Sequence, residues 1–291
     1  MDLSDPRDLA RLLLTHGVRA SNARSQHFLV DAEVLGAIVD AAELGPGDDV
    51  LEVGPGPGVL TRALAARCRS VTAVELDRRM VKVLRAVVAD LPNVTVVEAD
   101  ALAVDLFAAC PRPPTRIVAN LPYQITSPLL LRFLGDARRP ALVVVLVQAE
   151  VAKRMAAGPT AAGERGWLSV FVQSFAEPRF VRKVPPGAFR PAPRVHSAVV
   201  ALRTHAVPAF SPLAQEPFLR LVSDAFRHRR KQLVATLTFE AGATRVEALA
   251  ALATAGVSPE RRPEELSIPE WVRLASALGT PEARAVPVEG T

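Results

Sequence analysis

The chain has few cysteines and aromatic residues, and it has no long apolar run. Its 291 residues include two cysteines, Cys68 and Cys110, and aromatic residues make up 5% of the total. The cysteines lie far apart, without the paired spacing of a metal site or a disulfide framework, so we expect two reduced thiols and no bound metal. The strongest apolar run, residues 142–147, is far too short to cross a bilayer and predicts a central strand.

Positive charge is in slight excess, with 35 basic and 30 acidic residues and a formal net charge of +5. Such a balance suits a polyanionic partner. Only four of the basic residues are lysines, however, and a genome that favours arginine would produce the same excess, so net charge is weak evidence. Residues 1–5 lack the basic and apolar regions of a secretory signal, and we therefore expect a cytoplasmic protein.

The only tyrosine, Tyr123, stands three places after Asn120, which is one of three asparagines. Together they bracket the tetrapeptide Asn120-Leu121-Pro122-Tyr123. The apolar run before it, residues 116–119, predicts a buried strand, so the tetrapeptide should lie at the carboxyl end of a sheet. Open α/β folds place their chemistry at that edge, which makes the tetrapeptide a candidate site.

This tetrapeptide suits a reaction in which an exocyclic amino group attacks an electrophilic carbon. The Asn120 side-chain carbonyl and a backbone carbonyl beside the proline can accept both hydrogens of an aromatic amine, so that its lone pair points outward. Pro122 fixes φ and adds no competing N–H. Tyr123 offers a flat face on which a planar base can stack. The alternative is a turn that simply ends a strand and carries a half-buried tyrosine.

A glycine-rich turn at residues 54–58 follows a predicted strand at residues 50–53 and precedes a helical pattern that begins at Val59. Glycines here let the backbone pass close to a ligand, as in nucleotide-binding units. The pattern is G-x-G-x-G, and Val59 occupies the last glycine position of the dinucleotide fingerprint. The sequence therefore disfavours a pyrophosphate cofactor.

Carboxylates follow or interrupt three neighbouring predicted strands. Glu75 ends the strand at residues 70–74, where a carboxylate can accept hydrogen bonds from ribose hydroxyls. Asp100 follows the strand at residues 94–97 and could accept from an adenine amino group. Glu52 lies inside an apolar strand, as either a hydrogen-bonded structural group or a contact to the charged tail of the ligand. Taken singly, each terminal carboxylate could instead be a solvated strand end.

These segments resemble the ribosomal RNA adenine dimethyltransferases in order and spacing, and the later blocks are similar to the small-subunit branch. The matching segments are Gln26-His27-Phe28-Leu29, Glu52-Val53-Gly54-Pro55-Gly56, Glu75-Leu76-Asp77, Asp100-Ala101, Asn120-Leu121-Pro122-Tyr123, and residues 146–154, 185–195 and 226–231. The resemblance implies an α/β fold with a Rossmann-like class I methyltransferase sheet and a smaller C-terminal helical domain. It also implies transfer of methyl groups from S-adenosylmethionine to N6 of two adjacent adenines near the 3′ end of small-subunit RNA.

The resemblance assigns roles to individual positions. Asn120, Leu121, Pro122 and Tyr123 would hold the target amine, and Phe189 would face the flipped base from the other side, although a core phenylalanine explains Phe189 almost as well. The family usually has asparagine where this chain has His27, whose imidazole could replace the amide. The positions expected to line the cofactor site are His27, Leu29, Gly54, Gly56, Glu75, Asp100, Ala101 and Asn120.

We expect residues 1–204 to form the catalytic domain that binds S-adenosylmethionine, and residues 205–291 to form a helical RNA-binding domain. Apolar residues recur at helical intervals over residues 218–237, which predicts one helix with a basic face, either a surface for RNA phosphate or simply a solvated face. Helices are also predicted at residues 245–255 and after Ser267, where a capping box begins. The partner would be the small-subunit ribosomal RNA of an immature 30S-type particle. We expect the protein to be a monomer and not to bind a membrane. The residues expected to meet its RNA are Arg227, Arg229, Arg230 and Lys231.

Three other functions fit parts of the pattern. A large-subunit ribosomal RNA methyltransferase that confers antibiotic resistance would share the cofactor, fold and reaction. A small-molecule or protein-glutamine methyltransferase would share the amine chemistry, although Leu121 and the basic helical domain argue against it. A ribosome-assembly factor that binds RNA without catalysis would keep the fold, but the intact cofactor positions argue against lost binding.

Overall fold

The computed structural model describes residues 3, 5–18, 27–161, 163–228, 230–239 and 242–279. It contains two compact units. The first comprises Met1–Ala152 with Glu177–Thr204, and the second comprises Lys153–Ala176 with His205–Thr291. The segment Lys153–Ala176, which the sequence placed in the catalytic domain, thus packs with the C-terminal helices. The functions expected of the two domains stay a prediction. No helix of the described residues is long and apolar enough to span a membrane.

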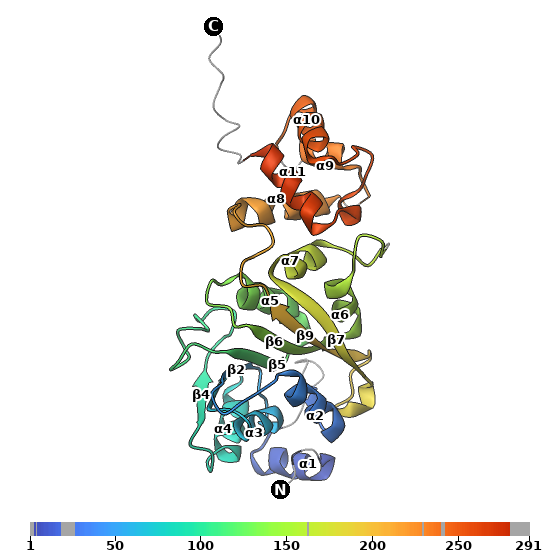
Figure 1. Cartoon of the computed structure of the whole chain (residues 1–291). Coiled ribbons are helices and arrows are strands. Elements are labelled where there is room, and N and C mark those ends of the chain that lie inside the picture. The colour runs from blue at the N-terminus through green and yellow to red at the C-terminus, as the bar shows by residue number, and fades with distance from the viewer. Residues whose placement is uncertain are drawn as a thin grey trace. The chain divides into compact units, whose positions relative to one another are not determined.

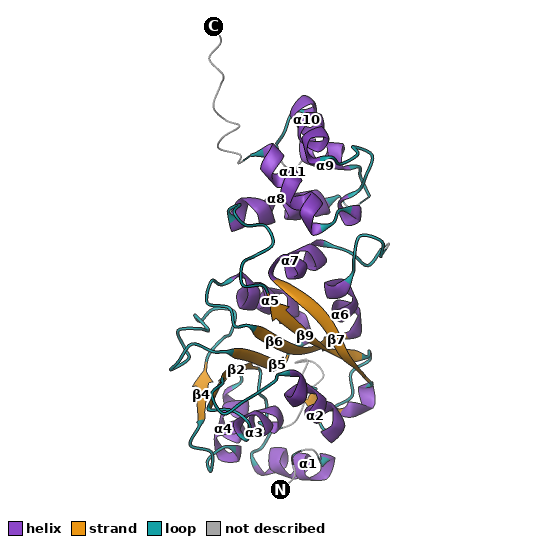
Figure 2. Cartoon of the chain, in the orientation of Figure 1, coloured by secondary structure: helices purple, strands orange, loops and turns teal. Residues whose placement is uncertain are grey.

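The first unit is built around a seven-stranded sheet, in the order β4-β3-β2-β5-β6-β9-β7 (Figures 1 and 2). Adjacent strands from β4 to β6 run parallel, whereas β9 is antiparallel to β6. A separate two-stranded sheet pairs β1 with β8 and sets Leu29 opposite Phe189. The strands are β1 (Phe28–Leu29), β2 (Asp49–Val53), β3 (Ser70–Glu75), β4 (Val94–Glu98), β5 (Arg116–Asn120), β6 (Leu142–Gln148), β7 (Ala176–Val184), β8 (Phe189–Arg190) and β9 (Ser197–Thr204).

Helices α3 and α4 lie on one side of the seven-stranded sheet, and α5 lies on the other side (Figure 1). Two apolar clusters hold the helices in place, one between the sheet and α2 and α3, and one that joins α1 to Phe28 and α4. The helices of this unit are α1 (Pro6–Thr15), α2 (Ala32–Ala41), α3 (Val59–Ala65), α4 (Arg78–Val87) and α5 (Thr126–Gly135), together with the 3-10 turns η2 (Tyr123–Ile125) and η3 (Pro186–Ala188). Helix α6 (Ala149–Ala156) begins in the first unit and ends in the second.

The strands predicted from apolar runs are present, and their directions follow from the connecting helices. The run at residues 142–147 forms β6, whose side chains are buried along almost its whole length. It lies between β5 and β9, so it is an interior strand, as predicted. The parallel register brings the ends of β2, β3 and β5 to one edge of the sheet, because Val53 pairs with Val74 and Leu51 with Ile117. That edge carries the glycine turn, Glu75 and Asn120.

The second unit is helical, with a 3-10 turn at η4 (Pro263–Glu265). Residues Arg245 to Ala255 form a helix as predicted, and Ser267 caps the last helix by accepting from the Glu270 N–H, while the Glu270 carboxylate accepts from the Ser267 N–H at 2.8 Å. The helices are α7 (Trp167–Phe175), α8 (Gln215–Arg227), α9 (Leu233–Phe239), α10 (Arg245–Ala255) and α11 (Ile268–Leu278).

The prediction of one helix over residues 218–237 was wrong. Helix α8 ends at Arg227, and α9 begins only at Leu233. The Lys231 N–H donates to the His228 carbonyl at 2.8 Å, and the Leu233 N–H donates to Arg261 at 2.8 Å, which lies far along the chain. A tertiary hydrogen bond therefore starts the second helix and replaces continued helical pairing.

Candidate active site

A cavity of about 500 Å³ opens at the edge of the sheet where β2, β3 and β5 end. Its walls come entirely from the first unit, and they bring together segments that lie far apart in the sequence. Every residue that the sequence assigned to the cofactor site lines this cavity. The predicted residues in its wall are His27, Leu29, Gly54, Gly56, Glu75, Asp100, Ala101 and Asn120, together with Leu121 and Pro122 of the tetrapeptide.

The glycine turn needs glycine for both conformation and space. Gly54 and Gly56 have φ values of 71° and 55°, in the left-handed region that side chains disfavour. A Cβ atom on Gly56 would lie 3.1 Å from the Phe28 ring. One on Gly54 would lie 3.4 Å from the Pro122 ring, so the turn and the tetrapeptide are in contact range. The cofactor wall and the amine-binding corner are therefore direct neighbours.

Glu75 is mostly buried and is held by backbone amides. Its Oε2 accepts from the Gly56 N–H at 3.1 Å, and its Oε1 accepts from the Asp77 N–H at 2.9 Å. Burial raises the pKa of Glu75, although these amides favour the ionised form. Each carboxylate oxygen can accept a second hydrogen bond. The side chain is thus oriented, and it retains acceptor capacity toward the cavity.

Asp100 lies in an exposed turn directly after β4. Its Oδ1 accepts from the Leu102 N–H at 2.8 Å, which fixes the side chain against its own turn. Ala101 beside it is buried. The Asp100 carboxylate keeps further acceptor capacity, as the role of an adenine-amino acceptor requires.

Glu52 is a buried carboxyl group in the cavity wall. Its side chain is 1% exposed and lines the wall, and its Oε2 has no hydrogen-bond partner among the described residues. Burial raises the pKa of Glu52 to about 8, and the charge of Glu75 adds to the rise. Glu52 is therefore mainly protonated at neutral pH. A buried carboxyl with a spare oxygen favours a cationic ligand group, which would return it to its ionised form.

In the tetrapeptide, the Asn120 Nδ2 donates to the His27 carbonyl oxygen at 3.2 Å. This bond orients the amide and leaves Asn120 Oδ1 as an acceptor. The Pro122 carbonyl already accepts from the Ile125 N–H at 3.1 Å and from the Thr126 hydroxyl at 3.2 Å. Both lone pairs of the Pro122 carbonyl oxygen are thus used. The Leu121 carbonyl is therefore the better partner for a target amine.

Tyr123 is half-buried behind this corner and is not part of the cavity wall. Its hydroxyl makes a 2.6 Å hydrogen bond with Ser197 Oγ, and its ring stacks on His27 with centroids 5.6 Å apart. Burial raises the pKa of the Tyr123 hydroxyl. The Nδ1 of His27 is in turn 2.8 Å from the Pro191 carbonyl. The aromatic pair thus ties the tetrapeptide to the segment around Pro191, and its role toward a base stays a prediction.

Phe189 lies in the core. Its side chain is 0% exposed and belongs to the same apolar cluster as Leu29, its partner in the two-stranded sheet. This matches the alternative that the sequence left open, a core phenylalanine. Stacking of Phe189 on a base would require the ring to be uncovered, and it stays a prediction of the resemblance.

The basic residues assigned to RNA lie in the second unit. Arg227 ends α8 and pairs with Asp224 at 3.5 Å, whereas Arg230 and Lys231 are exposed in the connection to α9. Because the helix is interrupted there, they do not extend a single helical face. Arg229 lies outside the described residues, as does Gln26 of the first matching segment.

Sequence reasoning missed several cavity residues. Met80 is a buried residue of the wall, and Leu76, directly after Glu75, is 65% exposed. An exposed leucine beside a candidate ribose ligand is itself a signal of a ligand-binding wall. The other residues of the wall that were not assigned are Phe28, Val53, Pro55, Pro57, Val59, Leu60, Val74, Asp77, Ala99, Gln124 and Ile125.

A parallel sheet that carries a glycine turn and carboxylates at its carboxyl edge, beside an Asn-Leu-Pro-Tyr corner, defines a Rossmann-like methyltransferase. Residues 18–279 match the model of the ribosomal RNA adenine dimethylase family, and the chain belongs to this family. Its methyl donor is S-adenosylmethionine. The residues present fit that molecule, since the wall of the cavity carries two carboxyl groups, Glu52 and Glu75, and the Oε2 of Glu52 has no hydrogen-bond partner among the described residues.

The relatives include two bacterial proteins named ribosomal RNA small subunit methyltransferase A. That of Desulfitobacterium hafniense is 40% identical over 276 residues, covering 95% of this chain and 98% of the relative. That of Moorella thermoacetica is 40% identical over 285 residues, with the same shares. Among solved structures, the 23S rRNA methyltransferase ErmE is 33% identical with a TM-score of 0.67, covering 86% of this chain and 99% of that one. A dimethyladenosine transferase from Plasmodium falciparum is 25% identical with a TM-score of 0.74, covering 85% and 96%.

Proposed function

We propose that this enzyme transfers methyl groups from S-adenosylmethionine to N6 of two adjacent adenosines near the 3′ end of small-subunit ribosomal RNA. The product is N6,N6-dimethyladenosine. One observation carries the chemistry: the Asn120 corner, whose Oδ1 has no hydrogen bond among the described residues, adjoins the glycine turn, since a Cβ atom on Gly54 would lie 3.4 Å from the Pro122 ring. The small-subunit substrate is supported by relatives that are 40% identical over nearly the whole chain.

The cofactor roles follow from the orientation of each carboxylate. Glu75 binds the ribose hydroxyls, because its two oxygens are preset by the amides of Gly56 and Asp77. Asp100 accepts from the adenine amino group. Glu52 faces the positively charged methionine end, where a cation offsets the cost of ionising a buried carboxyl. His27, Leu29 and Ala101 complete the wall.

The target amine is held by two acceptors, the Asn120 Oδ1 and the Leu121 carbonyl. Both of its hydrogens are then bound, and its lone pair points toward the methyl group that S-adenosylmethionine supplies. Most of the rate enhancement comes from this positioning of two reactants, since no strong base is needed. Tyr123 and Phe189 offer ring faces to the base, and in the case of Phe189 this requires the ring to emerge from the core.

An adenine inside a duplex cannot reach such a corner, so the target nucleotide is single-stranded or flipped out, at a cost of a few kcal/mol. Residues 1–204 form the catalytic domain in this proposal, and residues 205–291 contact RNA through Arg227, Arg229, Arg230 and Lys231. The substrate is an immature 30S-type particle in the cytoplasm, and the enzyme acts as a monomer.

A second candidate is methylation of large-subunit RNA. It is favoured by the match to ErmE, which extends over 99% of that chain at 33% identity. The site chemistry would be the same, because both reactions place an adenine amine beside the sulfonium. A non-catalytic assembly role is less well supported, since the oriented Glu75 and Asn120 serve no evident purpose without a ligand.

The test is a methyl-transfer assay on ribosomal particles. Tritiated methyl from S-adenosylmethionine should enter immature small subunits that lack the modification, and nuclease digestion should release dimethyladenosine. Purified large-subunit RNA and mature, fully modified small subunits serve as the controls. Incorporation confined to large-subunit RNA would establish the second candidate, and incorporation into neither RNA would overturn both.

A further inference from the structure

The turn that presents Asp100 is held by its own backbone and by a neighbouring element. The Asp100 carbonyl accepts from the Ala103 N–H at 3.0 Å and the Val104 N–H at 2.9 Å, while its Oδ1 accepts from Leu102. Residues 100–104 thus form one closed turn. Its first two residues, Asp100 and Ala101, line the cavity.

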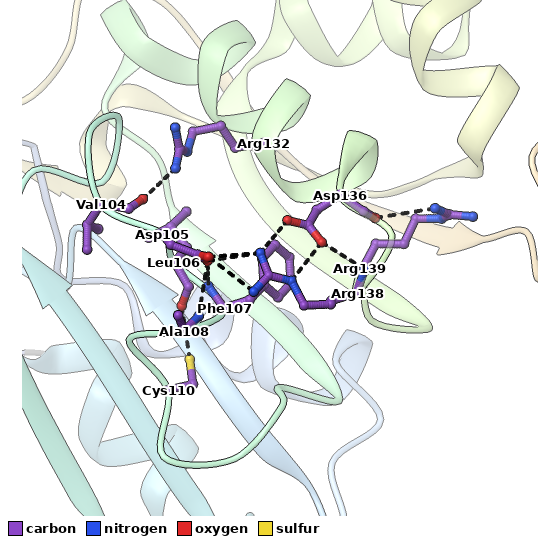
Figure 3. A network of polar contacts seen from close by, with 10 residues as sticks. All are labelled: Val104, Asp105, Leu106, Phe107, Ala108, Cys110, Arg132, Asp136, Arg138 and Arg139. Atoms are coloured by element: carbon purple, nitrogen blue, oxygen red, sulfur yellow. Dashed lines mark hydrogen bonds and ion pairs between the residues drawn. The ribbon is translucent and has the colours of Figure 1, made fainter. Parts of the chain in front are cut away.

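The other side of this turn meets Arg132, which projects from α5. One guanidinium nitrogen of Arg132, Nη1, donates to the Leu102 carbonyl at 2.7 Å. The other, Nη2, donates to the Val104 carbonyl, as Figure 3 shows. Among the described residues, Arg132 makes no ion pair with a carboxylate. Both terminal nitrogens of its guanidinium fork therefore donate to backbone oxygens.

Helix α5 connects Arg132 to the amine-binding corner. It begins at Thr126, directly after the 3-10 turn that contains Tyr123, so the Asn-Leu-Pro-Tyr corner and Arg132 lie on one continuous stretch of chain. The Thr126 hydroxyl also donates to the Pro122 carbonyl. One rigid segment thus touches the amine-binding corner at its start and the Asp100 turn near its end.

We propose that Arg132 is a positioning residue for the cofactor, because its double hydrogen bond fixes the turn that aims Asp100 at the adenine end of S-adenosylmethionine. This inference rests on the proposed role of the cavity as the cofactor site. A lysine at this position would supply a charge and donors on a single nitrogen but not the planar fork that reaches both carbonyls, so it would restore the effect in part.

Arg138 provides a matched control from the same neighbourhood. It pairs with Asp105 at 2.9 Å and with Asp136 at 2.7 Å, and its guanidinium lies 5.0 Å from the centre of the Phe107 ring (Figure 3). The Arg138 and Asp105 side chains are about half exposed, Phe107 is buried, and none of these residues lines the cavity. Removing Arg138 therefore perturbs the same loop without loosening the turn at Asp100.

The experiment measures binding of S-adenosylhomocysteine by calorimetry to the wild-type chain and to Arg132→Met, Arg132→Lys and Arg138→Met. The same titrations use S-inosylhomocysteine, in which an oxygen replaces the adenine amino group. We expect Arg132→Met to weaken S-adenosylhomocysteine binding about tenfold and to lose much of the preference for the amino form, since charge-assisted hydrogen bonds are removed. Arg132→Lys should be intermediate, and Arg138→Met should bind within about twofold of wild type.

Two results would overturn the inference while leaving the proposed function intact. One is wild-type affinity and preference in Arg132→Met. The other is an equal loss of affinity for both ligands in Arg132→Met, which would mean general damage to the fold. If the methionine variant does not fold, the two affinities are compared in Arg132→Lys instead. Failure of the wild-type chain to bind S-adenosylhomocysteine would instead refute the cofactor site, and the inference with it.

Discussion

At the scale of single residues, Glu52 combines a buried position with an incomplete set of hydrogen bonds. It lies one residue before the end of β2, a strand whose residues are all buried, and it lines the cavity wall. The sequence left two roles open for this side chain, a structural group or a ligand contact. Its Oε2 lacks a partner among the described residues, and this favours the second role.

Glu52 should make stability depend on pH. Its folded-state pKa of about 8 exceeds its usual value of 4.5, so the stabilising effect of the bound proton is complete below about pH 4.5 and is lost as the pH rises through 8. The loss is on the order of 4 to 5 kcal/mol at most. Denaturant unfolding of the ligand-free chain between about pH 5 and pH 9 should show this decline, which Glu52→Gln should reduce. The exposed Glu177→Gln is the control, and parallel profiles for wild type and Glu52→Gln would refute the expectation.

Other residues differ in how far the sequence could place them. Glu75, Asp100 and Asn120 reach one cavity because parallel strands end at one edge, which a strand prediction already implies. The directions of the aromatic rings did not follow from that logic. Tyr123 packs on His27, and Phe189 is covered by the core, since ring orientation is decided by whatever segments pack nearby.

At the scale of elements, the connection from β2 to α3 is the most constrained part of the site. Gly58 is the residue before α3 and has a φ of 90°. A Cβ atom there would lie 2.8 Å from Leu84 Cδ1 and 3.1 Å from Val87 Cγ1, both on α4. The last glycine of the turn is therefore needed for helix packing as well as for backbone conformation.

We expect Gly58→Ala to lower the free energy of unfolding by about 2 to 4 kcal/mol, from a strained φ and an overpacked contact with α4. Gly36→Ala is the control, because Gly36 lies within α2 and a Cβ atom there meets nothing within 4 Å. That change should be neutral or stabilising, since alanine is the better helix former. Guanidinium unfolding of both variants measures the difference, and equal stabilities would contradict the packing argument.

Helix ends were predictable where local signals mark them. The capping box at Ser267 fixes the start of α11 by hydrogen bonds within four residues. The end of α8 lacked such a signal, because apolar spacing continues from residue 218 to residue 237. The break appears only with the bond from Leu233 to Arg261, which joins two distant segments.

At the scale of the whole molecule, buried Arg165 helps explain why Lys153–Ala176 belongs to the second unit. Its guanidinium donates to the Ala157 carbonyl at 2.6 Å and to the Leu266 carbonyl at 3.0 Å. It also donates to Gln173 at 2.8 Å. One side chain thus binds the inserted segment to the helices at the C-terminal end, a pairing that no local pattern predicts.

The second unit should give RNA binding its salt dependence. Replacing both Arg230 and Lys231 with alanine removes two exposed cations, and it should weaken RNA binding at low salt and reduce the slope of log affinity against log salt by roughly 1 to 2. Fluorescence anisotropy over a range of salt concentrations measures both. The paired control is Arg182→Ala with Arg203→Ala, whose guanidinium groups are engaged by Glu33 and Glu43. An equal change in slope for the two double variants would rule out a specific role for this connection.

The sequence by itself predicted strands β2 to β6 and β9 and the residues that lie at the carboxyl edge of the parallel strands. It could do so because apolar periodicity, glycine turns and caps act over a few neighbouring residues. Only the tertiary structure decided that Phe189 is buried, that residues 218–237 form parts of two helices, and that Arg132 donates hydrogen bonds to the turn beside Asp100. Each of these depends on contacts between segments remote in the chain, where the competing partners are known only after folding.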